Sequence, residues 1–143
     1  MIKPGAVRKE MVLDLDIAPT ILEIAGIAPR KEMQGHSMLG LTKGDDPGWR
    51  KEWLYDYYEY PGFEDMQPHR GVRTETHKIM HFYTMNEWEM YDLSRDPEEK
   101  YNLYGKPEHA ALQKDMEARL EKVFNEVPWL PGGPTSVKPS KSF

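Results

Sequence analysis

YYEYPGFEDMQPHRGVRTETHKIMHFY, residues 57–83, is the stretch that determines the fold of this chain. Aromatic and polar residues alternate in short runs, and the alternation breaks at Pro61 and Gly62 before it resumes. A period of two residues is typical of strands that bury one face, and short connections make neighbouring strands antiparallel. With a hairpin turn at Glu75 and Thr76, and WEMYDL following at 88–93, we expect four strands: 53–60, 70–75, 77–83 and 88–93.

Two helical patterns flank these strands. Pro107 suits the first turn of a helix that we expect to continue to residue 126, with an apolar side chain about every turn. A sheet of four strands needs its apolar face covered, and this helix is the nearest cover. Its apolar positions are Leu112, Met116, Leu120, Val123 and Phe124.

Helical signals also precede the strands. Asp16 can cap a helix that carries an apolar stripe of Ile17, Ile21, Leu22 and Ile24. Gly26 would end this helix, and GHSMLGLTKG (35–44) predicts a second, short helix with Ser37 as its cap.

The predicted fold class is therefore α+β, in three parts. Residues 1–48 are typical of the last strand and helix of a larger α/β domain, which leaves the stripe on the first helix without a sheet to join. Residues 49–127 are expected to form the antiparallel sheet with its long helix. Residues 128–143 are rich in Pro, Gly and Ser without any period, which predicts an extended tail.

Composition excludes several classes of function. The chain has 143 residues, with 19 basic and 24 acidic side chains interspersed, for a net charge of −5. This balance argues against nucleic acid or an anionic membrane as a partner. No run approaches the roughly 20 apolar residues of a membrane span, and the opening MIKPGAVRKE lacks the apolar stretch of a signal peptide. The absence of cysteine excludes a thiol nucleophile and thiolate metal sites from this chain.

The motifs resemble those of a known family. IKPGAV (2–7), DLDIAPTILEIAGI (14–27) and MQGHSML (33–39) are similar to the passage that closes the large α/β domain of sulfatases in the alkaline-phosphatase-like superfamily. EYP, H-x-GVRT, HKIMHFY, WEMYDL and DPEEKYNLYG then resemble the C-terminal subdomain of the same enzymes. The resemblance covers about residues 2–127 and is nearest to the C-terminal region of the N-sulphoglucosamine sulphohydrolase type.

The resemblance implies a sulfuric ester hydrolase that cleaves a sulfate ester or sulfamate on a sulfated sugar such as a glycosaminoglycan, in the periplasm or outside the cell. In this family a formylglycine, made from the Cys or Ser of a C/S-x-P-x-R motif, attacks sulfur, and Ca²⁺ binds the sulfate oxygens. That motif is missing here, so we expect no catalytic residue and no metal ligand in this chain. The chain alone should be inactive, with the missing N-terminal catalytic portion as its partner.

What the resemblance carries over is the rim of the substrate pocket. The loop before GVRT reaches the pocket mouth in relatives, and its histidine, here His69, is expected to bind the sugar through an imidazole that can donate and accept hydrogen bonds. Arg70 is expected to bind a second anionic group, unless it is only a solvated strand start. Glu64 and Asp65 disfavour a polysulfated substrate. Arg73 is expected to form an ion pair within the sheet.

Other interpretations stay open. Asp14 and Asp16 are expected to be cap and turn residues rather than metal ligands. His77 and His81 share a strand but lie ~13 Å apart, too far to share one ion. The chain could also be a noncatalytic binding or interaction module, or a fragment of a related phosphodiester or phosphonate hydrolase. The upstream sequence separates the last possibility, because C/S-x-P-x-R indicates a sulfatase.

Overall fold

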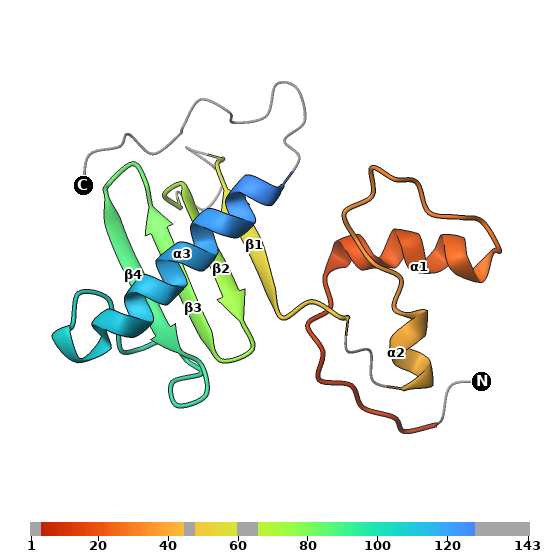
Figure 1. Ribbon diagram of the computed structural model, residues 1–143, viewed down its shortest axis with the longest axis horizontal. Coiled ribbons are helices and arrows are strands. Elements are labelled where there is room, and N and C mark those ends of the chain that lie inside the picture. Colours follow the sequence, from red (N-terminus) through yellow and green to blue (C-terminus); the bar gives the residue numbers. More distant parts are fainter. Residues whose placement is uncertain (1–3, 45–47, 60–65, 128–143) are drawn as a thin grey trace. The chain divides into compact units, whose positions relative to one another are not determined.

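The computed structural model describes residues 4–44, 48–59 and 66–127 (Figure 1). The chain forms two compact units, Met1–Lys51 and Glu52–Phe143. No helix among the described residues is long and apolar enough to cross a membrane.

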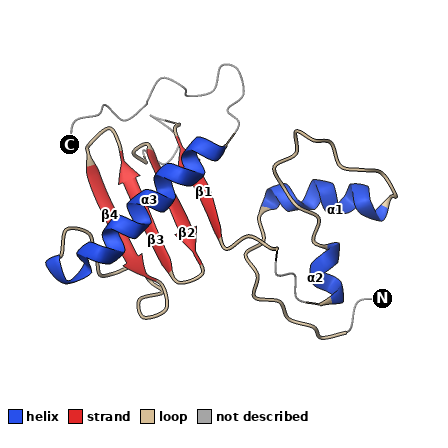
Figure 2. Cartoon of the chain, in the orientation of Figure 1, coloured by secondary structure: helices blue, strands red, loops and turns tan. Residues whose placement is uncertain are grey.

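The second unit is built on an antiparallel sheet of four strands in the order β1-β2-β3-β4 (Figure 2). The strands are β1 (Glu52–Tyr57), β2 (His69–Thr74), β3 (His77–Phe82) and β4 (Glu87–Asp92). This confirms the predicted sheet, although β1 ends at Tyr57, and residue 60 lies outside the described residues. The predicted hairpin turn between β2 and β3 is confirmed as well. There the Thr74 hydroxyl accepts a hydrogen bond from the His77 amide at 2.9 Å.

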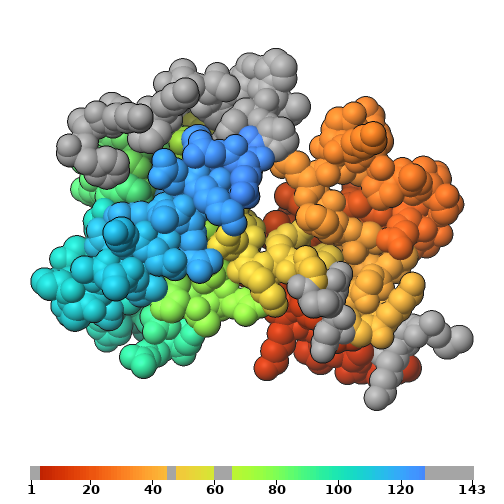
Figure 3. Space-filling view, viewed as in Figure 1, coloured from red at the N-terminus to blue at the C-terminus, as the bar shows by residue number. Residues whose placement is uncertain are grey.

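The hydrophobic core lies between this sheet and one long helix. That helix is α3 (Ala110–Glu126), which follows the short 3-10 helix η2 (Pro107–His109) and lies across one face of the sheet (Figures 1 and 3). Val72, Ile79 and Met90 lie side by side in register and are fully buried. Burial of each such side chain contributes about 1.5–3 kcal/mol. The helix supplies the other half of the core, as predicted, through Met116, Leu120 and Val123, with Leu112 partly buried beside them.

The other face of the sheet carries aromatic side chains along β1, because successive strand residues point to opposite faces. Tyr55 lies opposite Gly71 in the register of β1 and β2. A Cβ atom on Gly71 would come within 2.4 Å of both the Tyr55 hydroxyl oxygen and the backbone oxygen of Ile79. Glycine at this position therefore lets the tyrosine side chain lie directly on the sheet.

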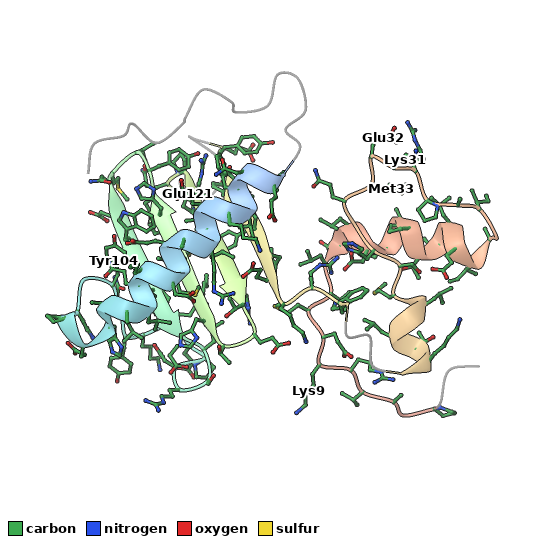
Figure 4. All side chains as sticks on the ribbon, viewed as in Figure 1. Lys9, Lys31, Glu32, Met33, Tyr104 and Glu121 are labelled. Atoms are coloured by element: carbon green, nitrogen blue, oxygen red, sulfur yellow. The ribbon has the colours of Figure 1, made fainter. Side chains whose placement is uncertain are left out.

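The segment after β4 returns along that strand. Leu103 donates its amide to the Met90 carbonyl at 2.8 Å, and the side chain of Asn102 bonds to the Met90 amide and the Trp88 carbonyl, both at 3.0 Å. Tyr104, labelled in Figure 4, donates its hydroxyl to Glu117 of α3 at 2.9 Å. The NLYG motif thus ties the last strand to the covering helix.

The first unit holds two short helices. The 3-10 helix η1 (Asp14–Asp16) leads into α1 (Ile17–Ile24), and α2 (Leu39–Lys43) follows. Gly26 follows the end of α1 with a positive φ of 72°, as predicted. Residues 4–13 are not in a strand, because a strand needs a neighbour and the described residues of this unit supply none. The second helix forms as predicted, but its N-cap is Met38 and not Ser37; the Ser37 hydroxyl accepts a hydrogen bond from the Leu39 amide at 3.3 Å.

Asp16 is the N-cap residue of α1, as predicted, but its side chain makes no cap hydrogen bond to that helix, because its carboxylate is the centre of a buried ion pair. Arg50 donates to both carboxylate oxygens, at 2.5 and 2.6 Å, and the amides of Leu13 and His36 donate to the same group at 2.8 and 2.9 Å. Burial alone would raise the pKa of Asp16, but the hydrogen bonds from Arg50, His36 and Leu13 outweigh burial and lower it. Three separate segments of the unit therefore meet at one carboxylate.

We predict that Gly71→Ala destabilises the chain by about 1–3 kcal/mol, because the new methyl group meets a backbone oxygen that cannot move without disturbing the sheet. Urea unfolding followed by circular dichroism measures this change. Gly44→Ala is the matched control, because a Cβ there meets nothing within 4 Å. Equal stability of Gly71→Ala and the parent chain would contradict the close approach.

We predict that Asp16→Asn destabilises the first unit by about 3 kcal/mol at pH 7, because Arg50 loses its charged partner. The native pKa of Asp16 lies below its ordinary value of 3.8, so this stabilisation is present above pH 3.8 and is lost as the pH falls below it. The difference between variant and parent should therefore shrink in acid.

The indole N–H of Trp49 reports on this unit by NMR, because it donates to the Met11 carbonyl at 2.8 Å and the side chain is buried. Asp14→Asn is the control, since Asp14 is exposed two residues away. A difference between Asp16→Asn and the parent that stays constant from pH 7 to pH 2 would contradict the linkage.

Candidate functional site

His69 begins β2 and lies opposite Tyr57 of β1 on the face away from α3. Its Nδ1 atom lies 2.9 Å from the Gln67 carbonyl oxygen. A carbonyl oxygen can only accept, so Nδ1 carries the hydrogen, and in the neutral ring Nε2 is left as an acceptor. The tautomer of the imidazole is therefore fixed by the loop that leads into the strand.

Three aromatic rings surround the His69 imidazole. The Tyr57 ring stacks on it at 5.6 Å with an interplanar angle of 24°. Phe82 lies at 5.0 Å and Tyr55 at 5.8 Å between ring centroids. Only 9% of His69 is exposed, so the packed rings restrict the orientation of the imidazole.

Arg70 points to the opposite face, where it meets Asp56 across the two strands. Its Nη2 atom lies 3.3 Å from Asp56 Oδ2, and the two side chains are 7% and 8% exposed. The guanidinium carbon lies 4.1 Å from the ring centroid of Phe124 of α3 and 4.8 Å from that of Tyr83. Burial raises the pKa of Asp56, and the positive charge of Arg70 opposes that rise. Arg70 is not a solvated strand start.

The two predicted rim residues are thus neighbours in sequence but lie on opposite faces of the sheet. Sequence reasoning missed Asp56 as the partner of Arg70. It placed the ion pair of the sheet at Arg73, but Arg73 is exposed and Arg70 forms a buried pair. Strand alternation places the side chains of residues 56 and 70 on the same face of the sheet. This identifies them as partners only once the register of β1 and β2 is known.

A surface hollow lies at the end of β1, lined by Asp56, Tyr57, Tyr58 and Glu59. Of its two acidic side chains, Asp56 is buried against Arg70 and Glu59 is exposed, as is Tyr58 at 62%. Glu64 and Asp65, expected to make this rim acidic, lie outside the described residues. A hollow of this character suits groups that donate hydrogen bonds, such as hydroxyls, better than it suits sulfate.

The described part of the chain contains no group of three or more His, Asp or Glu side chains that could hold a metal ion. The Asp16 carboxylate is occupied by four hydrogen-bond donors, so it has no need of a cation. These residues do not fit the Ca²⁺ site of a sulfatase, and we derive no catalytic step from them.

A family model described as "N-sulphoglucosamine sulphohydrolase, C-terminal" matches residues 1–126. The chain is 40% identical over 125 residues to an N-acetylglucosamine-6-O-sulfatase of Bacteroides thetaiotaomicron, covering 85% of this chain and 22% of that protein. Human N-sulphoglucosamine sulphohydrolase is 36% identical over 80 residues, which cover 52% of this chain and 16% of the human protein. The chain therefore spans about a fifth of the length of such relatives.

Solved structures of related enzymes have the same fold as this chain. One protein in complex with its substrate D-glucosamine-2-N,6-O-disulfate matches with a TM-score of 0.74 and 39% identity, over 78% of this chain and 23% of that one. The phosphonate monoester hydrolase of Agrobacterium radiobacter shares the fold, with a TM-score of 0.60 at 24% identity over 78% of this chain and 24% of its own. The α+β architecture predicted from the sequence is that of the sulfatase C-terminal subdomain. The chain thus belongs to the N-sulphoglucosamine sulphohydrolase C-terminal family, within the sulfatases of the alkaline-phosphatase-like fold.

Proposed function

We propose that this chain is the C-terminal part of a sulfuric ester hydrolase and forms part of the rim of its substrate pocket. The observation that carries this proposal is the geometry of His69. Its Nε2 acceptor is fixed by the bond from Nδ1 to the Gln67 carbonyl, and aromatic rings hold the imidazole in place. A fixed acceptor beside aromatic side chains suits a sugar, whose hydroxyls donate and whose ring has apolar faces.

The chemical step belongs to another part of the protein. The sequence contains no C/S-x-P-x-R motif, so the formylglycine nucleophile and its Ca²⁺ would come from an N-terminal catalytic portion. The apolar surface of α1 is consistent with such a partner. Ile17, Ile21 and Ile24 are 50%, 59% and 68% exposed, which is costly for side chains of this kind in water. We propose that the catalytic portion covers them, and that residues 1–48 complete its α/β domain.

The proposed substrate is a sulfated amino sugar from a glycosaminoglycan, carrying a sulfate ester or a sulfamate. The relative named for 6-O-sulfated N-acetylglucosamine and the neighbour that holds a disulfated glucosamine support this class. In the hollow at the end of β1, the exposed acidic side chain of Glu59 favours a part of the sugar that carries free hydroxyls. We therefore expect few sulfate groups on the portion of substrate that reaches this rim.

The geometry favours His69 over Arg70 as the substrate contact. The positive charge of Arg70 is compensated by Asp56, and the arginine side chain is 7% exposed. Binding of a second anionic group by Arg70 remains part of the proposal, but it would require the pair to open. A phosphonate or phosphodiester hydrolase is the second candidate, because that class shares the fold. A C/S-x-P-x-R motif upstream supports the sulfatase, and an unmodified Thr or Ser nucleophile contradicts it.

We predict that the purified 143-residue chain does not hydrolyse 4-nitrophenyl sulfate, with or without added Ca²⁺. Nucleophile and metal are both supplied elsewhere, and their joint removal leaves no route to turnover. Release of 4-nitrophenolate is measured against a buffer blank. Metal-dependent turnover by this chain would contradict the proposed division of labour.

We predict that His69→Ala in the full-length enzyme raises KM for the sulfated sugar about 2- to 13-fold, the worth of one neutral hydrogen bond of about 0.5–1.5 kcal/mol. KM for 4-nitrophenyl sulfate should stay unchanged, because this substrate lacks the sugar hydroxyls. Steady-state kinetics on both substrates measures the contrast.

His77→Ala is the matched control, since His77 begins the next strand and bonds to Thr76. It should change neither KM. Equal losses on both substrates in His69→Ala would place His69 at the sulfate or in a purely structural role, and no loss on either would refute the rim assignment.

A further inference from the structure

We propose that Asp56 is a positioning residue, which through Arg70 holds the end of β2 so that the His69 imidazole faces the sugar. This inference rests on the proposed function and adds a residue whose carboxylate is buried against Arg70, on the face of the sheet away from His69. It follows from the order of residues at the ends of three strands, from the contacts of Arg70, and from the burial of the Asp56 carboxylate without a hydrogen-bond donor among the described residues.

Each of three strand ends contributes consecutive residues to opposite faces. From β1, Tyr57 stacks on His69 while Asp56 pairs with Arg70. At the end of β3, Phe82 contacts His69, and the following residue, Tyr83, lies against Arg70. His69 and Arg70 are themselves consecutive. Each aromatic ring that surrounds the imidazole therefore has a backbone neighbour that contacts the guanidinium.

Arg70 also connects this end of the sheet to the covering helix. Its guanidinium lies over the ring of Phe124, which belongs to the last turns of α3. An arginine fixed between a carboxylate and two aromatic rings has few alternative rotamers, and its backbone is fixed with it. Because the His69 main chain is joined directly to that of Arg70, the orientation of the imidazole depends on the same contacts.

Placing the Asp56 carboxylate in this buried position costs desolvation free energy. The carboxylate is nine-tenths buried, and neither oxygen accepts a hydrogen bond from the described residues, although Oδ2 is within ion-pair distance of Arg70. A buried pair of this kind is weak support for stability, whereas it can specify one arrangement of its surroundings. Burial also raises the pKa of Asp56, because the site disfavours the charged form. The presence of a carboxylate at this position is explained by its control over Arg70.

The test uses a double-mutant cycle in the full-length enzyme, with Asp56→Asn, His69→Ala and the double variant. We expect Asp56→Asn to raise KM for the sulfated sugar about 2- to 10-fold, within the factor lost in His69→Ala, and to leave KM for 4-nitrophenyl sulfate unchanged. In the His69→Ala background Asp56→Asn should have no further effect on either KM. Multiplicative effects in the double variant, or no effect of Asp56→Asn, would overturn the inference.

Glu52→Gln is the matched control. Glu52 lies on the same face of the same strand and pairs with Arg119 of α3 at 2.7 Å, but at the opposite end of β1. It should lower the melting temperature without changing the ratio of the two KM values, and a changed ratio would show that any loosening of β1 against α3 suffices. If Asp56→Asn does not fold, Phe124→Leu tests the same link from the helix. It should raise the same ratio, and an unchanged ratio would overturn the inference.

A spectroscopic readout separates this inference from the proposed function. In the 143-residue chain, ¹⁵N NMR of the His69 ring should show hydrogen on Nδ1, and Asp56→Asn should mix the two tautomers while Glu52→Gln does not. An unchanged tautomer in Asp56→Asn overturns the positioning role, whatever the kinetics show. If the tautomer shifts but His69→Ala leaves the KM for the sugar unchanged, the rim function fails and the structural coupling stands.

Discussion

The antiparallel register between β1 and β2 is the constraint on which the rest of the second unit depends. It sets Leu54 beside Val72 in the core, Tyr55 over Gly71, and Asp56 beside Arg70. Because strand side chains alternate, a slip of one residue would exchange the faces of every side chain in the strand. The slipped strand would expose Leu54 and bury Tyr55 under the helix. One register thus creates the core, the ion pair and the surroundings of His69 together.

Two kinds of packing share the face under α3. Its middle is apolar and follows the usual logic of burial, whereas its end near Tyr57 holds a charged pair. The apolar part supplies stability, because hydrophobic burial is the dominant favourable term and a buried ion pair roughly cancels its own desolvation. The charged part determines how the strand ends meet. The apolar middle of the strands therefore stabilises the fold, and the ion pair at their ends orients the side chains there.

The sequence was sufficient to predict the strands, the covering helix and its buried positions, since these depend on periodicity within single segments. The pairing of β2 with β3 could also be read, because the Glu75–Thr76 turn fixes its register. The pairing of β1 with β2 could not, since the long connection from Tyr57 to His69 lets many registers close at similar entropic cost. Asp56 and Arg70 could not be matched for that reason, and Asp16 and Arg50 were missed because they lie 34 residues apart in the chain. Both of these contacts are ion pairs between separate segments, where residue type alone does not identify the partner.

The bonds that Asn102 makes to β4 have a consequence for how the sheet meets other molecules. The side-chain amide of Asn102 takes the place of a peptide group, and Leu103 contributes a backbone amide. The backbone groups of Met90 and the Trp88 carbonyl on the outer edge of β4 are therefore already hydrogen-bonded. Exposed strand edges are templates for aggregation and for strand exchange between copies. Within the described residues β1 has a strand on one side only. Self-association through added strands would therefore begin at β1.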